Sequence, residues 1–191
     1  MKQLKKNVKI CLERRGYVVG KSEESEEYGF IIPFVNGKMQ GKVFYCDKDK
    51  MNQDDLSKIF REFVDGDQHV IVLYKDITPP AYNSFKDHIS KFMPHSELIE
   101  IAKFYQDIMS HPLISEYQIL TAKEKAELIK VYKTEEKLFP HVLTTDPIAI
   151  LMGFKDGFMI RCFCYYNFTK KCIDKEMPPA ITYYLVTSEN C

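Results

Sequence analysis

The sequence predicts an α/β (α+β) fold made of two modules, and three observations lead to this prediction. Apolar stripes of helical period alternate with short apolar runs through the first hundred residues, as expected when helices pack on a sheet. The chain has 191 residues, which suits one large domain or two small ones. Its 45% hydrophobic and 13% aromatic residues can form a core, and they exclude a disordered chain.

The N-terminal module, residues 1–103, is predicted to alternate helices and strands around a central sheet. An apolar face of Leu4, Val8, Cys11 and Leu12 predicts a first helix that ends at Gly16. We expect strands at 18–19, 30–35, 42–46, 70–74 and 98–101, a turn at 36–37 and an acidic loop at 21–27. Pro33 lacks an N–H group, so its strand is expected to lie at a sheet edge or to be bent.

Two further helices are expected between these strands. Asn52 is the predicted cap of the first, which ends at Gly66. Thr78 is the predicted cap of the second, with Pro79 at its first position. Their expected buried stripes are Leu56, Ile59, Phe60, Phe63 and Val64 in the first, and Ala81, Phe85, Ile89 and Phe92 in the second.

A connector at 104–110 is predicted to lead into a C-terminal module, residues 111–191. Thr121 and Glu124 form a capping box that predicts a helix start, and Asp146-Pro147 predicts a second, shorter helix that ends at Gly153. The apolar face of the first of these helices is expected to contain Ala126, Leu128, Ile129 and Tyr132. An extended segment at 142–143, strands at 158–163 and 181–186, and a polar excursion at 167–179 complete the module.

The charge balance limits the kinds of partner that the protein can bind. Lys and Arg number 27 and Asp and Glu number 27, so bulk positive charge cannot drive nucleic-acid binding and any such contact must be local. No run of 18 apolar residues predicts a membrane span, and the first residues lack the apolar stretch of a signal peptide. The six cysteines form no regular pairs, which predicts reduced thiols in a cytosolic or nuclear protein.

Motifs for hydrolytic and nucleotide chemistry are missing from the sequence, namely GxSxG, GxxxxGK[ST], GxGxxG and HExxH. Cys162, Cys164 and Cys172 could bind zinc, although an apolar strand explains the first two better. The acidic and basic residues 46–50 lack the acid-x-Lys spacing of a metal-dependent nuclease, which we keep as a less favoured alternative. We therefore expect no catalytic residue, metal, cofactor or small-molecule ligand.

The junction between the strand 70–74 and the following helix is a candidate phosphate contact. A helix start presents free N–H groups, and Thr78, Tyr82, Asn83 and Lys86 add side-chain donors. An ordinary capped helix start explains the same residues, and the motif by itself favours that simpler interpretation.

The C-terminal module resembles a known family through motifs that occur in one order. They are His111-Pro112-Leu113-Ile114, the helix start Thr121-Ala122-Lys123-Glu124, Pro140, Asp146-Pro147-Ile148-Ala149 followed by Gly153 and Gly157, and Ile181-Thr182-Tyr183-Tyr184-Leu185-Val186. In this order they are similar to the fifth subunit shared by eukaryotic RNA polymerases I, II and III and to its archaeal counterpart. The segments 11–19 and 70–81 resemble the N-terminal half of the eukaryotic subunit more loosely.

The resemblance implies a non-catalytic subunit of a multisubunit DNA-directed RNA polymerase. It implies an N-terminal jaw domain (1–103) beside downstream duplex DNA and a C-terminal assembly domain (111–191) on the largest subunit. The residues implied near DNA are Thr78, Pro79, Ala81, Asn83 and Lys86; those implied at the assembly interface are Asp146, Pro147, Ala149, Gly153, Gly157 and Arg161. Archaeal members consist of the C-terminal domain alone, so the N-terminal module indicates a eukaryotic or large-DNA-virus origin, with a nuclear location or a host-cytoplasm or virion location respectively.

Three departures from the family pattern bear on docking. Ile150 and Tyr184 stand where the family has Arg, and the polar stretch 167–179 replaces the R-P-S-E-T-A-G segment of the family. They indicate a docking surface that has diverged together with its partner or has been rebuilt. The alternative from another class is a stand-alone transcription regulator that uses the same fold as an interaction module.

Overall fold

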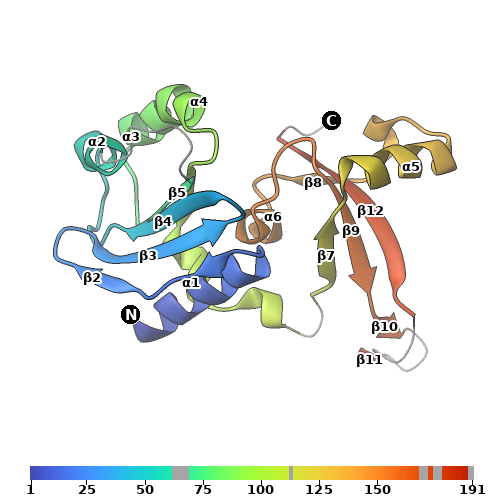
Figure 1. Ribbon diagram of the computed structural model, residues 1–191, viewed down its shortest axis with the longest axis horizontal. Helices are drawn as coiled ribbons and strands as arrows, with labels where there is room; N and C mark the ends of the chain where they lie inside the picture. Colours follow the sequence, from blue (N-terminus) through green and yellow to red (C-terminus); the bar gives the residue numbers. More distant parts are fainter. Residues whose placement is uncertain (62–68, 112–113, 168–171, 174–177, 189–191) are drawn as a thin grey trace. The chain divides into compact units, whose positions relative to one another are not determined.

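The computed structural model describes residues 1–61, 69–111, 114–167, 172–173 and 178–188 (Figure 1). The chain divides into two compact units, Met1–Gln106 and Asp107–Cys191. The boundary falls inside the predicted connector, whose first residue, Phe104, ends a short 3-10 helix and is buried in the first unit. No described helix has the length and apolar character needed to cross a membrane.

The first unit is built on a six-stranded mixed sheet. Its strands are β1 (Val18–Val19), β2 (Glu23–Ser25), β3 (Gly29–Asn36), β4 (Met39–Tyr45), β5 (His69–Tyr74) and β6 (Glu97–Glu100). The order is β1-β3-β4-β5-β6, with β2 also paired to β3. β4, β5 and β6 run parallel to one another, and β3 forms an antiparallel hairpin with β4. The almost fully buried β5 lies between β4 and β6, as its continuous apolar run predicts.

Helices cover both faces of this sheet (Figure 1). They are α1 (Lys2–Arg14), α2 (Gln53–Arg61), α3 (Pro79–Ser84), a π-helical turn (Phe85–Ile89) and α4 (Ser90–Phe92), with a 3-10 turn at Ile101–Phe104. Side chains alternate along β5: Val70 and Val72 pack with α2, whereas Ile71 and Leu73 face α1. The predicted apolar face of α1 is confirmed.

Two expectations about the outer strands are corrected. The segment 21–27 is not simply a loop, because Glu23–Ser25 forms β2 on the outer edge of β3. β3 is therefore not an edge strand, although it does contain a register shift at Gly29/Phe30. Pro33 lies between the residues of β3 that pair with β1 and those that pair with β2, and its carbonyl accepts the Gly20 N–H. Because the carbonyl and the nitrogen of one residue point to the same side of an antiparallel strand, the ring nitrogen of Pro33 also points away from β4. The missing N–H therefore removes no hydrogen bond to β4.

The helix after β5 also differs from its prediction in detail. Thr78 occupies the cap position of α3 with an extended backbone, but its side chain makes no capping hydrogen bond. Ala81 is buried and Phe85 and Ile89 are half-buried against the core, whereas Phe92 is 81% exposed. The π-helical turn after Ser84 holds more residues than an α-helical turn, so the residues that follow it leave the α-helical register that placed Phe92 on the predicted stripe.

The second unit contains a four-stranded sheet in the order β7-β9-β12-β8. Its strands are β7 (Glu116–Ile119), β8 (His141–Leu143), β9 (Met159–Cys164) and β12 (Ala180–Thr187); a small separate ribbon pairs β10 (Tyr166–Asn167) with β11 (Cys172–Ile173). Helices α5 (Ala122–Tyr132) and α6 (Pro147–Met152) and 3-10 turns at Ile108–Ser110 and Glu136–Leu138 complete it. β12 pairs antiparallel with β9 and parallel with β8.

Two small cores form on this sheet. Leu128 of α5 packs with Leu120, Phe139 and Met159, while Ala149 of α6 belongs to a second cluster with Phe154, Ile160 and Val186. The expected apolar face of α5 is partly wrong, because Ala126 is exposed and Tyr132 is 57% exposed. β7 was not predicted, although Glu116–Ile119 alternates polar and apolar residues; the alternation covers only four residues, the shortest length at which it indicates a strand.

Some predicted features lie outside the described residues. They are the end of the α2 stripe (Phe63, Val64 and Gly66), Pro112 and Leu113 of the first motif, and most of the polar excursion at 167–179.

Candidate interaction surfaces

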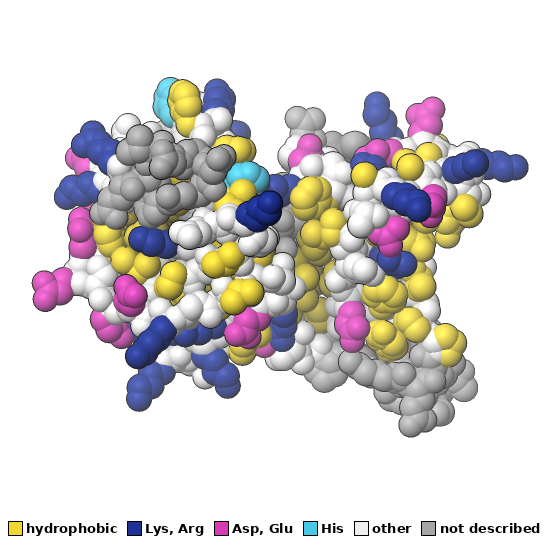
Figure 2. All heavy atoms as spheres, in the orientation of Figure 1, with side chains coloured by type: hydrophobic (Ala, Val, Ile, Leu, Met, Phe, Trp, Pro, Cys, Tyr) yellow, Lys and Arg dark blue, Asp and Glu magenta, His cyan; other side chains and the backbone are white. Residues whose placement is uncertain are grey.

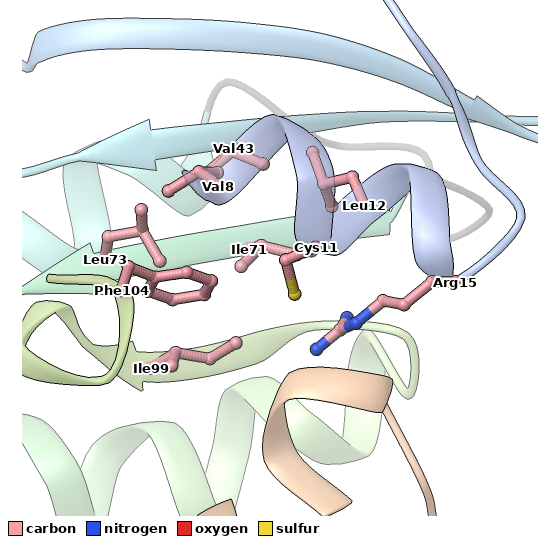
Figure 3. A pocket seen from close by; sticks show the side chains of 9 residues that line it. All are labelled: Val8, Cys11, Leu12, Arg15, Val43, Ile71, Leu73, Ile99 and Phe104. Atoms are coloured by element: carbon pink, nitrogen blue, oxygen red, sulfur yellow. The ribbon is translucent and has the colours of Figure 1, made fainter. Parts of the chain in front are cut away.

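A small cavity between α1 and the sheet is part of the core of the first unit (Figure 3). Its lining is apolar except for Arg15, which Figure 3 shows at the end of α1. The cavity has room for no more than about one water molecule. It is therefore a packing feature, and the surfaces of the two units are where partners can bind.

The predicted DNA-proximal residues lie at the junction between β5 and α3. Pro79, Asn83 and Lys86 are exposed, and Thr78 is half-buried with its N–H donated to the Met51 carbonyl. Ala81 is fully buried, so it holds the helix against the core and cannot itself reach a partner. The structure thus gives four of the five residues some access to the surface along one short helical stretch.

A shallow hollow opens where the N-terminal ends of α2 and α3 lie side by side. Its lining residues are Lys50, Asn52, Gln53, Asp54, Thr78, Pro79 and Pro80. Asn52 caps α2 as predicted: its side chain accepts the Asp55 N–H at 2.9 Å, and Asp55 accepts the Asn52 N–H at 3.1 Å. This reciprocal cap occupies two of the N–H groups that the start of α2 would otherwise offer to an anion.

The lysines beside this hollow are largely neutralised by the protein itself. Lys50 pairs with Asp76 at 3.2 Å, and Lys75 lies 3.1 Å from Asp47 and 3.3 Å from Asp49. Hydrogen bonding to Asp47 raises the pKa of Lys75, so this lysine stays charged. Lys86, by contrast, is exposed and has no ion-pair partner among the described residues, which leaves its charge available to a partner.

In the second unit, five predicted interface residues lie on α6 or the turns around it. The Asp146 carboxylate accepts the Ile148 and Ala149 N–H groups at 2.7 and 3.4 Å, so the predicted cap is confirmed. Gly153 ends the helix in the left-handed conformation (φ 68°, ψ 30°), also as predicted. Pro147 and Gly157 are exposed, whereas Ala149 is fully buried and supports the helix from within the core.

Arg161 lies on β9, on the α5 side of the sheet. Its Nη2 donates to the Glu124 carboxylate at 3.1 Å, and its guanidinium lies 5.5 Å from the centre of the Phe163 ring. Hydrogen bonds from the Thr121 N–H and hydroxyl lower the pKa of Glu124, and Arg161 lowers it further. The capping box of α5 therefore also fixes the orientation of Arg161.

Beside Arg161 the same face of the sheet carries apolar and aromatic side chains, of which Tyr183 packs against Leu128 and Tyr132 of α5. Phe163 pairs with Ile181, and Arg161 pairs with Tyr183, so all four share one face of β9 and β12. Ile181 is 47% exposed, and Figure 2 shows hydrophobic side chains gathered over these two strands. We call Arg161, Phe163, Ile181 and Tyr183 the sheet surface.

Sequence reasoning singled out Arg161 but missed the other three residues of the sheet surface. The period-2 alternation of 181, 183 and 185 was the available signal, since it assigns these residues to one face of a strand. Which of the two faces a helix covers depends on contacts distant in sequence, and alternation does not contain that information.

The similarity to known proteins is concentrated in the second unit, Asp107–Cys191. Residues 106–163 match the family model described as RNA polymerase Rpb5, C-terminal domain. The chain is 36% identical over 56 residues to "DNA-directed RNA polymerase subunit Rpo5" of Thermococcus onnurineus, covering 29% of this chain and 68% of that protein. This chain belongs to the RNA polymerase subunit 5 family.

Eukaryotic members of the subunit 5 family match over a longer stretch at lower identity. "DNA-directed RNA polymerases I, II, and III subunit RPABC1" of Caenorhabditis briggsae is 28% identical over 121 residues, which are 62% of this chain and 56% of that protein. The Caenorhabditis elegans protein of the same name is 33% identical over 92 residues, 48% of this chain and 43% of that protein. The chain thus spans about half the length of the curated eukaryotic relatives it matches.

Proposed function

We propose that this protein acts in transcription as a non-catalytic subunit of a multisubunit DNA-directed RNA polymerase. The observation that carries the proposal is membership of the subunit 5 family through residues 106–163. In this proposal the unit Asp107–Cys191 docks on the largest polymerase subunit, and the unit Met1–Gln106 lies beside downstream duplex DNA. Catalysis belongs to other subunits.

The sheet surface is the proposed contact with the largest subunit. It combines an exposed aliphatic side chain, two half-buried aromatic side chains and an arginine fixed by Glu124, a composition typical of interface centres. The predicted interface residues Asp146 and Gly153 contribute to docking by fixing both ends of α6. Ala149 contributes through the core, since it is buried.

Binding to the purified largest subunit tests the sheet surface. We expect Ile181→Lys to weaken binding by at least about tenfold, because it places a charge inside an apolar contact; a tenfold loss is about 1.4 kcal/mol. The matched control is Val131→Lys, which introduces the same change at a 74% exposed position of α5 outside the sheet surface. Equal binding by the two variants would exclude the sheet surface as the docking site.

The helical stretch after β5 is the proposed neighbour of downstream DNA. Lys86 supplies a charge there that no described residue neutralises, and Pro79 and Asn83 are exposed beside it. The helix start and this one lysine together meet only one or two phosphates, and phosphate contacts contain no base information. In this proposal the rest of the enzyme holds the duplex, which fits a chain of zero net charge.

The salt dependence of DNA binding by the assembled polymerase tests this contact. Each neutralised phosphate contributes about −0.9 to the slope of log affinity against log salt, so Lys86→Ala should reduce that slope by at most about one unit without altering sequence preference. Lys123→Ala, at an exposed lysine of α5, is the matched control. An unchanged slope for Lys86→Ala would move the DNA contact elsewhere.

The proposed location follows the source of the polymerase. Eukaryotic relatives act as subunits of RNA polymerases I, II and III by their names, and a eukaryotic protein of this kind would be nuclear. A viral copy would function in the host cytoplasm or the virion. The genes that neighbour this one distinguish the two, since a viral gene set around it would assign the second location.

A further inference from the structure

One face of α1 carries three lysines that pair with no other residue in the described part of the chain. Lys2, Lys6 and Lys9 follow at i, i+4 and i+7, which places them on one side of the helix, opposite the buried side that includes Leu4 and Val8. Lys2 and Lys6 are exposed and Lys9 is half-buried; among the described residues, none forms a hydrogen bond or an ion pair with these ammonium groups. Figure 2 shows Lys and Arg side chains grouped over α1, in the lower left of the view. We call these three residues the lysine face.

The lysine face works against the stability of its own helix. Lys2 lies at the positive end of the helix dipole, where a cation is unfavourable, and the first turn contains no acidic residue. Lys2 and Lys6 also repel each other at i, i+4 spacing. Of the nearest opposite charges, Glu24 pairs with Lys5, and Glu13 follows Lys9 by four residues on the same side of the helix, so the face carries a net charge of +2. Charged side chains that lower the stability of their own helix, with no stabilising contact to offset the loss, are typical of a binding site.

We propose that the lysine face binds the phosphate backbone of duplex nucleic acid without reading its sequence. The three residues span about 10 Å along the helix, at 1.5 Å per residue, and the face is convex and has no apolar side chain. An acidic protein segment would need an apolar anchor to bind such a surface tightly, whereas a duplex supplies dense charge on its own. Lysines suit this task as mobile point charges.

This site is separate from the proposed downstream-DNA contact. α1 covers one face of the sheet of the first unit, and α2, α3 and α4 cover the other face (Figure 1). One straight stretch of duplex cannot touch both faces at once. The lysine face therefore takes a different stretch of nucleic acid, and the inference does not depend on the proposed function.

Anisotropy titration of the full chain with a fluorescent duplex of about 25 base pairs, at about 20–200 mM salt, tests the proposal. Three phosphate contacts give a slope of about −2.7 for log affinity against log salt, or a roughly 40-fold loss of affinity between about 50 and 200 mM. The triple variant Lys2→Gln/Lys6→Gln/Lys9→Gln should lose most of this slope. The control Lys123→Gln/Lys130→Gln/Lys137→Gln removes the same charge from exposed lysines of the other unit and should retain it.

Further variants and a second ligand distinguish binding by the lysine face from binding by bulk charge or by an acidic protein. The charge-retaining variant Lys2→Arg/Lys6→Arg/Lys9→Arg should keep the slope, and circular dichroism should show folded helix in every variant. Equal slopes for the two glutamine variants would overturn the proposal, because bulk charge would then explain the binding. Poly-glutamate that binds as tightly as the duplex would overturn it too, and would assign the face to an acidic protein.

Discussion

At the scale of single residues, the feature that most constrains the first unit is a buried charged cluster. The Glu97 carboxylate on β6 accepts hydrogen bonds from Arg15 Nη1 and His69 Nε2, each at 3.0 Å. Arg15 follows the last residue of α1 and is almost completely buried. Burial acts to raise the pKa of Glu97, but the charge of Arg15 and the hydrogen bond from His69 outweigh it and lower the pKa to about 2.

Removing the negative charge of this cluster should destabilise the protein strongly. Glu97→Gln removes the carboxylate charge that pairs with the buried Arg15 guanidinium, so we expect the free energy of unfolding to fall by about 3–5 kcal/mol in urea denaturation. The double variant Arg15→Leu/Glu97→Leu removes both charges and should lose less than the single variant. A double variant at least as unstable as Glu97→Gln would contradict this.

Because the pKa of Glu97 is lowered in the folded state, we expect the stability of the protein to depend on pH. A folded-state pKa of about 2, below the ordinary value of 4.5, means that Glu97 stabilises the folded state above about pH 4.5 and loses that contribution as the pH falls toward 2. Between about pH 5 and pH 2.5 the wild type should lose about 2–3 kcal/mol more of its unfolding free energy than Glu97→Gln loses. Urea unfolding of both proteins at the two pH values measures this; equal losses would show that the Glu97 pKa is not lowered.

Among residues, those with local functions were predictable and those with distant contacts were not. Asn52, Thr121 and Asp146 were identified as caps because a cap and its partner lie within three residues. The burial of Ala81 could be inferred from its stripe, but the Arg15–Glu97 pair joins residues 82 positions apart. No sequence spacing indicates such a pair.

At the scale of elements, the helix α6 connects sequence most directly to the proposed docking function. Its start is fixed by Asp146 and its end by Gly153 in the left-handed conformation. Asp146→Ala removes a carboxylate that accepts two N–H groups, and should lower the free energy of unfolding by about 0.5–2 kcal/mol in urea denaturation. Unchanged stability would show that these hydrogen bonds contribute nothing beyond those made with water.

The other end of α6 gives a sharper test of docking. Gly153→Val forces a β-branched residue into the left-handed region and should reduce both stability and binding to the largest subunit. Gly153→Asn is the matched control, because Asn tolerates that conformation and should retain most of both. Normal binding by Gly153→Val would separate the geometry of α6 from docking.

Elements with a strong period or a cap were predicted, and short edge strands were not. β5 and α1 have apolar patterns that only one type of element satisfies. β2 forms from acidic residues because the outer edge of β3 offers unpaired backbone groups, and β7 forms because β9 does the same. Pairing with an existing strand decided β2, which has no apolar residue, and β7, whose alternation covers only four residues.

At the scale of the whole molecule, the similarity to known proteins that assigns the family lies mainly in the second unit. The family model lies almost entirely within Asp107–Cys191, whose motifs were identifiable in the sequence. The sheet surface in that unit was not predictable, since it depends on which face α5 covers. In Met1–Gln106 the sequence predicted the layers of the fold and a charged face on α1, and the structure added that no described residue pairs with Lys2, Lys6 or Lys9.

The most direct test of the central proposal is the composition of the complex that this chain forms in its native source. Native mass spectrometry of material purified through a tag on the full chain should detect one copy of it together with the two largest polymerase subunits. A complex that lacks both of these subunits, or a chain that purifies alone from actively transcribing cells, would contradict the account and favour a stand-alone regulator.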